Sequence, residues 1–205
     1  MSQGRHDVVA VGLTGAIGAG KSTALAMFGE LGALAVSADE VVHALYLQPE
    51  CTARLAARFG PAVLDARGEV DRKRLAKSVR GRSEELRWLE TITHPRVAEE
   101  IERRVQEAPV GSVVVCEVPL LFESRYQDLF DLIVTIEAGR QNRRKRSVHL
   151  FDLDMFTELE GLQASSEQRV MGSHLAFFND DDLDHLREFV RRAYERAREL
   201  LQEGR

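Results

Sequence analysis

The chain has 205 residues, 44% of them hydrophobic and 30% charged, which are the proportions of a folded globular protein and exclude a disordered or fibrous one. Its formal net charge is −5, and so mildly acidic a chain is not expected to bind nucleic acid, although a local basic cluster can still bind phosphates. The sequence has no apolar run near the roughly 18 residues of a membrane-spanning helix, no signal-peptide pattern, and two widely separated cysteines that predict neither a disulfide nor a zinc site. We therefore expect one cytoplasmic domain over residues 1–205, a monomer or weak homo-oligomer, without nucleic-acid or membrane partners.

The first part of the chain reads as strand, loop, helix and strand. Val8–Leu13 is a short, continuously apolar run, typical of a buried strand in a parallel sheet. A glycine-rich stretch, residues 14–20, precedes a helical pattern that starts at Lys21 and stops at Gly32, and Ala33–Val36 is a second strand. This βαβ unit predicts an α/β fold with a parallel sheet.

The middle of the chain, residues 40–107, is mostly helical in pattern. It is interpreted as an insertion rather than a separate domain, because strand patterns resume after it at residues 113–117 and 132–136. Asp71 is placed as the N-cap of the helix that follows it. Pro95 falls inside a helical pattern and is expected to kink or restart the helix there.

A nucleotide-binding motif follows the first predicted strand. Residues 15–22, Gly-Ala-Ile-Gly-Ala-Gly-Lys-Ser, match the P-loop pattern G-x-x-x-x-G-K-[ST] between a strand and a helix, which is the context it requires. The glycines let the backbone turn several N–H groups toward one anion, at the positive end of a helix dipole. Lys21 suits the β- and γ-phosphates of ATP, and the Ser22 hydroxyl suits Mg²⁺. The predicted ATP-binding residues of this segment are Gly15, Gly18, Ala19, Gly20, Lys21, Ser22 and Thr23.

Two carboxylates stand at the ends of predicted strands, where ligands of open α/β sheets bind. Asp39 could accept a proton from a substrate hydroxyl or hold the metal through water, or it could cap the helix from Glu40. Glu117 could face the hydration shell of Mg²⁺ or cap a loop. His94 could contact the substrate, or it could cap and kink the helix at Pro95.

A basic run over residues 140–146 has helical spacing. Arg140, Arg143 and Arg144 are predicted to share one face, while Arg146 points elsewhere. Most charge runs are solvated helix faces, but in a P-loop kinase an arginine-bearing lid neutralises the charge that develops during phosphoryl transfer. The lid is the favoured interpretation here, with Arg144 as a catalytic residue and Arg143 binding ATP.

Several of these segments together closely resemble the dephospho-coenzyme A kinase family. The resemblance covers residues 8–190 and rests on the P-loop segment 13–23, on Ser37-Ala-Asp39, on His94-Pro95 and on Glu117-Val-Pro-Leu-Leu-Phe-Glu123. Many kinases share the P-loop, whereas its combination with the last two segments is far more specific. Gln163 and Asn179 also fall near the places that the family pattern expects.

The resemblance implies that ATP and Mg²⁺ serve to phosphorylate the ribose 3′-hydroxyl of dephospho-coenzyme A. It implies a three-layer P-loop core with a helical substrate-binding insertion at about 40–107 and a helical lid at about 140–165. Asp39 is then the general base, and Asn179 binds ATP. Asp39, His94 and Glu117 are the predicted substrate-binding residues.

The sequence departs from the family pattern beside Asp39 and in the lid. Ser37 stands where the family usually has an aspartate, and Val148 where it typically has a second lid arginine, which Arg143 or Arg146 could replace. Two alternatives therefore stay open. One is a kinase acting on another nucleoside or nucleotide, and the other is a non-catalytic nucleotide-binding protein with a divergent lid.

Overall fold

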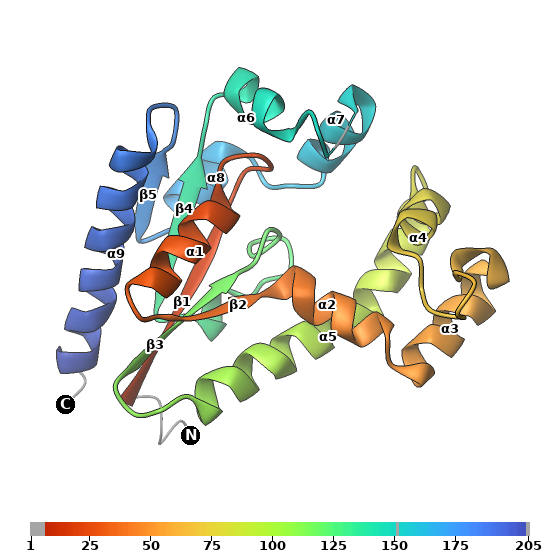
Figure 1. Ribbon diagram of the computed structural model, residues 1–205, viewed down its shortest axis with the longest axis horizontal. Helices are drawn as coiled ribbons and strands as arrows, with labels where there is room; N and C mark the ends of the chain where they lie inside the picture. Colours follow the sequence, from red (N-terminus) through yellow and green to blue (C-terminus); the bar gives the residue numbers. More distant parts are fainter. Residues whose placement is uncertain (1–6, 151, 204–205) are drawn as a thin grey trace. The chain divides into compact units, whose positions relative to one another are not determined.

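The chain forms two compact units, and a computed structural model describes residues 7–150 and 152–203 of it (Figure 1). The first unit comprises residues 1–38 and 101–205, and the second comprises residues 39–100. The second unit falls within the predicted helical insertion. The prediction that all 205 residues form a single domain stays a prediction.

The first unit is built on a five-stranded parallel sheet in the order β2-β3-β1-β4-β5. The central strand β1 is buried along its whole length, which explains its uninterrupted apolar sequence. Its neighbour β4 is also buried at every position, and β3 is buried at every position but its first. The strands are β1 (Val8–Gly15), β2 (Leu34–Ser37), β3 (Ser112–Glu117), β4 (Leu132–Glu137) and β5 (Leu175–Phe178).

Helices of the first unit cover this sheet and connect its strands. The amphipathic helix α9 packs against α1, and both add apolar side chains to the main core with β1, β3 and β4. The short helix α8 lies against β1 and β4. The helices are α1 (Lys21–Glu30), α6 (Arg140–Ser147), α7 (Leu153–Gly161), α8 (Ser166–Met171) and α9 (Leu183–Glu203), with a 3₁₀ turn η3 (Gln127–Leu129).

The second unit is helical and has a small core of its own. It contains α3 (Pro49–Phe59), the 3₁₀ turn η2 (Pro61–Val63), α4 (Arg72–Val79) and most of α2 (Ala38–Tyr46) and α5 (Ser83–Glu107). Asp71 caps α4 as predicted, its carboxylate accepting hydrogen bonds from two backbone N–H groups of the first turn. The core residues are Leu45, Tyr46, Cys51, Leu55, Val63, Val70, Leu75 and Ile92.

Two local expectations differ from the structure. Helix α5 runs through Pro95 without restarting, because apolar residues on both sides of the proline, such as Ile92 and Val97, are buried and hold the helix together. The helix after β2 begins at Ala38, so Asp39 lies in its first turn and is not its N-cap. Among the described helices, none combines the length and apolarity that crossing a bilayer requires.

Candidate active site

The P-loop joins β1 to α1 through glycines whose backbone conformation strains any residue with a side chain. Gly15, Gly18 and Gly20 have φ angles of 140°, 74° and 105°, in the region that side chains disfavour. A Cβ atom on Gly15 would lie 1.9 Å from the carbonyl oxygen of Ile136 in β4. The loop therefore turns tightly against the sheet and opens directly into the N-terminus of α1, where an anion is stabilised.

Lys21 is held at the mouth of this loop. Its side chain is buried at 8% exposure, and its Nζ donates hydrogen bonds to the carbonyl oxygens of Gly15 at 3.0 Å and Ala16 at 3.1 Å. The ammonium group is thus fixed by the backbone that surrounds it. A phosphate on the loop would meet a positive charge already in place.

Ser22 and Glu117 bring two oxygen ligands together beside Lys21. Glu117 ends β3 and is paired in register with Leu13 of β1 and Ser37 of β2. The Ser22 hydroxyl donates a hydrogen bond to Oε1 of Glu117 at 3.3 Å, and Glu117 is buried at 9% exposure. Hydroxyl and carboxylate oxygens suit Mg²⁺, which keeps several waters and shares phosphate oxygens, so this pair fits the predicted metal position.

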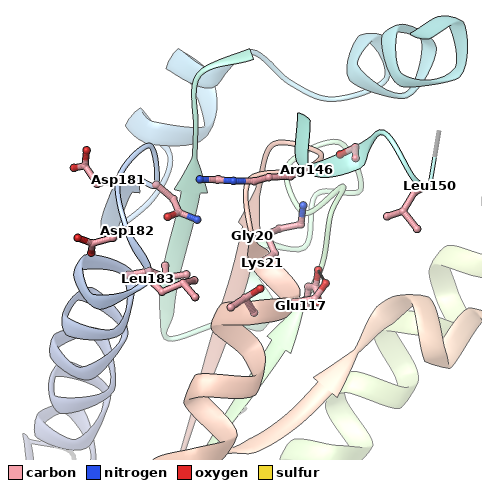
Figure 2. A pocket seen from close by; sticks show the side chains of 14 residues that line it. Gly20, Lys21, Glu117, Arg146, Leu150, Asp181, Asp182 and Leu183 are labelled. Atoms are coloured by element: carbon pink, nitrogen blue, oxygen red, sulfur yellow. Dashed lines mark hydrogen bonds between the residues drawn. The ribbon is translucent and has the colours of Figure 1, made fainter. Parts of the chain in front are cut away.

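A pocket of about 530 Å³ lies over these groups (Figure 2). The P-loop and α1 form its floor, and the end of α6, the loop after β5 and the start of α9 form its walls. The lining residues are Gly18, Gly20, Lys21, Ser22, Thr23, Glu117, Arg146, Ser147, Leu150, Asn179, Asp181, Asp182, Leu183 and Leu186. Of the predicted P-loop residues, all but Gly15 and Ala19 line this cavity, and Asn179 lines it too.

Asn179 fastens the loop after β5 to the P-loop. Its Nδ2 donates to the carbonyl oxygen of Ala19 at 2.8 Å, and its backbone N–H donates to the carbonyl oxygen of Glu137 at 2.7 Å. The approach is so close that a Cβ on Gly20 would lie 2.6 Å from Nδ2. Asn179 is buried at 4% exposure, and its role in binding ATP stays a prediction.

The predicted lid arginines divide into different environments. Glu160 of α7 binds two of them, Arg140 Nε at 2.8 Å and Arg143 Nη2 at 2.6 Å. Burial raises the pKa of Glu160, but hydrogen bonds from both guanidinium groups outweigh burial, and its pKa lies below the ordinary value. Arg144 is exposed and is not among the residues that line the pocket, whereas Arg146 is.

Two polar anchors of the site depend on contacts that the sequence does not reveal. The Gln163 side chain accepts a hydrogen bond from Ile17 N at 2.8 Å and donates to the carbonyl oxygens of Gly15 and Pro119, both at 3.1 Å. Glu137, at the end of β4, forms a buried ion pair with Arg169 of α8. A charge directly after the apolar strand 132–136 was the available signal for this pair, which our sequence analysis missed.

Asp39 and His94 belong to the second unit. Asp39 is exposed in the first turn of α2, directly after Ala38, and His94 is partly buried in α5. Chain connectivity places Asp39 two residues beyond Ser37, whose strand position is paired with Glu117. Roles for Asp39 and His94 at the site stay predictions.

Comparisons with known proteins agree with this geometry. The family model for dephospho-CoA kinase matches residues 9–185. The dephospho-CoA kinase of Mannheimia succiniciproducens is 32% identical over 200 residues, covering 94% of this chain and 93% of the relative. That of Aquifex aeolicus is 30% identical over 187 residues, covering 90% of this chain and 95% of the relative.

Solved structures show the same three-layer α/β fold. A protein of Thermus thermophilus superposes with a TM-score of 0.76 at 25% identity, covering 92% of this chain and 97% of that one. The dephospho-CoA kinase of Campylobacter jejuni gives a TM-score of 0.63 at 22% identity, covering 93% and 97%. The predicted fold class is confirmed, and the family match over most of the sequence shows that this chain belongs to the dephospho-CoA kinase family.

Proposed function

We propose that this protein transfers the γ-phosphoryl group of ATP to the ribose 3′-hydroxyl of dephospho-CoA, giving CoA and ADP. The observation that carries the proposal is the pocket in which the P-loop, Lys21, Ser22 and Glu117 meet, in a chain of this family. Phosphoryl transfer asks for positioning and charge neutralisation rather than covalent catalysis, and these groups supply both.

Each group of the pocket has a distinct task in this proposal. The backbone N–H groups of residues 18–23 and the Lys21 ammonium bind the phosphates of ATP. Ser22 would bind Mg²⁺, and Glu117 would face its hydration shell. When bound, the metal ion neutralises charge between the phosphates.

Asp39 is the proposed general base. Its carboxylate accepts the proton of the 3′-hydroxyl as the ribose oxygen forms a bond to the γ-phosphorus and the bond to the β-phosphate oxygen breaks. Its exposure in the first turn of α2 leaves it accessible to a substrate. His94 is proposed to contact the same substrate.

An assay of Asp39→Asn tests the base. We expect kcat with dephospho-CoA to fall about 10²- to 10⁴-fold, the usual contribution of a positioned base, while ATP affinity is nearly kept. Glu40→Gln is the matched control, because Glu40 is the neighbouring exposed acid of the same helical turn. Full turnover by Asp39→Asn would show that another group takes the proton.

A substrate panel separates the proposal from its rivals. The wild-type chain is given ATP with dephospho-CoA, nucleosides or nucleoside monophosphates, and the product is identified by its mass. We expect phosphorylation of dephospho-CoA alone. Transfer to a nucleotide would favour a different kinase activity, and ATP binding without transfer to any acceptor would favour a non-catalytic protein.

A further inference from the structure

Arg146 is the arginine of α6 that enters the pocket. Figure 2 shows its side chain extended across the cavity on the lid side of Gly20 and Lys21. Its Nη1 donates to the carbonyl oxygen of Ala19 at 3.5 Å, at the long limit of a hydrogen bond. Because this hydrogen bond is weak, the guanidinium can give up the Ala19 carbonyl and bind a phosphate on the loop instead.

The packing of α6 decides which arginine can reach the phosphates. A Cβ on Gly18 would lie 2.4 Å from Ser147 Oγ and 2.5 Å from the carbonyl oxygen of Arg143, so the face bearing these two residues sits directly on the P-loop. Residues two apart on a helix differ by about 200° around its axis, so Arg144 and Arg146 lie on opposite sides of that face. Of these two arginines, Arg146 lines the pocket and Arg144 does not.

The other arginines of the helix that contact this region already have strong partners. Arg140 and Arg143 share the carboxylate of Glu160, and Arg143 also donates from Nε to the Ala138 carbonyl at 2.9 Å. Both guanidinium groups lie within 6 Å of the Phe156 ring, at 5.9 and 5.7 Å from its centroid. Within residues 7–150 and 152–203, no carboxylate lies within ion-pair distance of Arg146.

We propose that Arg146 binds the phosphates of the nucleotide and is the arginine with which the lid neutralises their charge. The inference rests on the proposed function for its place in phosphoryl transfer, but the binding of a polyphosphate can be measured without any acceptor. Arg140 and Arg143 then act as structural ties between α6 and α7. Arg144 remains on the outer side of the helix.

Calorimetric binding of ATP–Mg²⁺ and of inorganic tripolyphosphate to the full-length chain tests Arg146. Arg146→Ala should weaken both ligands about tenfold or more, the value of a charge-assisted hydrogen bond, and Arg146→Lys should recover part of the loss. Tripolyphosphate is the decisive probe because it lacks a base, so a role in stacking on adenine would leave its affinity unchanged.

Lys145→Ala is the charge-matched control, since Lys145 is an exposed cation of the same helix and the pocket does not include it. We expect its affinities to stay within twofold of the wild type. Tripolyphosphate binding by Arg146→Ala within twofold of the wild type would overturn the proposal, and so would a larger loss in Arg144→Ala than in Arg146→Ala. A wild-type chain that binds ATP but does not phosphorylate dephospho-CoA would refute the proposed function and leave the binding result intact.

Discussion

Replacing Arg169 with methionine should destabilise the first unit strongly, because it leaves a buried charge without its partner. Arg169 and Glu137 are 4% and 2% exposed. Two parallel hydrogen bonds join them, from Nε to Oε1 at 2.6 Å and from Nη2 to Oε2 at 2.8 Å. A third bond from Arg169 reaches the carbonyl oxygen of Ala164, so the guanidinium also holds the chain before α8.

The magnitude follows from this burial. Removing one partner of a buried pair costs about 3–5 kcal/mol, since the remaining carboxylate must stay dehydrated and unpaired or take up a proton. At about 2–4 °C per kcal/mol for a chain of this size, Arg169→Met should melt about 6–20 °C below the wild type. Thermal and urea unfolding followed by circular dichroism measure the change, provided that the transition is two-state.

A double variant distinguishes the unpaired charge from simple loss of packing. Glu137→Leu together with Arg169→Met removes both charges and fills a similar volume, so it should regain most of the lost stability. A single variant that loses less than about 1 kcal/mol would refute the claim that the pair is desolvated. A double variant as unstable as Arg169→Met would show that packing and not charge carries the effect.

The remaining predictions concern single groups. Gln163→Ala should weaken ATP binding about threefold to tenfold in calorimetry, because the P-loop and the segment after β3 lose a shared hydrogen-bond partner, and an unchanged affinity would contradict this anchoring role. Burial raises the pKa of Cys116 to about 12, so this thiol and the buried Cys51 should react with a disulfide reagent only after unfolding, and rapid labelling of the native chain would contradict the burial. Because the pKa of Glu160 is lowered in the fold, its contribution to stability is present above its ordinary value of 4.5 and is lost as pH falls through the folded value. The free energy of unfolding should therefore change less between pH 6 and pH 3 for Glu160→Gln than for the wild type. Equal changes in the two proteins would argue against the pairing of Glu160 with the arginines.

Local sequence patterns were sufficient for the part of the fold that carries the P-loop. Three predicted elements are confirmed: the strand Val8–Leu13, the helix start at Lys21 and the strand near Val36. Each is determined by residues close together in the chain, through a continuous apolar run, a glycine-rich turn and a helical period. The expectation that Pro95 kinks or restarts the helix fails in its second part, because the helix continues through the proline without a restart. Burial of residues on both sides of the proline outweighs its local cost, and tertiary burial does not appear in a local pattern.

The same distinction explains what could be predicted of the site. Lys21, Ser22 and their loop are contiguous, so a motif identifies them. Arg146 lines the pocket because α6 packs closely on Gly18 through Ser147 and the Arg143 carbonyl. These contacts join residues more than a hundred positions apart in the sequence. Helical spacing grouped Arg140, Arg143 and Arg144 on one face, but it could not say which residues of the helix face the P-loop, nor that Arg140 and Arg143 share Glu160 while Arg144 is exposed.

Charge at the scale of the pocket explains why one arginine there should matter more than the basic run as a whole. The charged residues that line the cavity are two basic, Lys21 and Arg146, and three acidic, Glu117, Asp181 and Asp182. A polyphosphate would therefore enter a cavity whose side chains are not net positive, and its binding must depend on backbone N–H groups, on Mg²⁺ and on each of the two cations. Val148, where the family pattern has a second lid arginine, is exposed just beyond the end of α6. Arg146, two residues earlier, supplies the positive charge from inside the pocket instead. It lies next to Ser147, whose small side chain lets α6 approach Gly18.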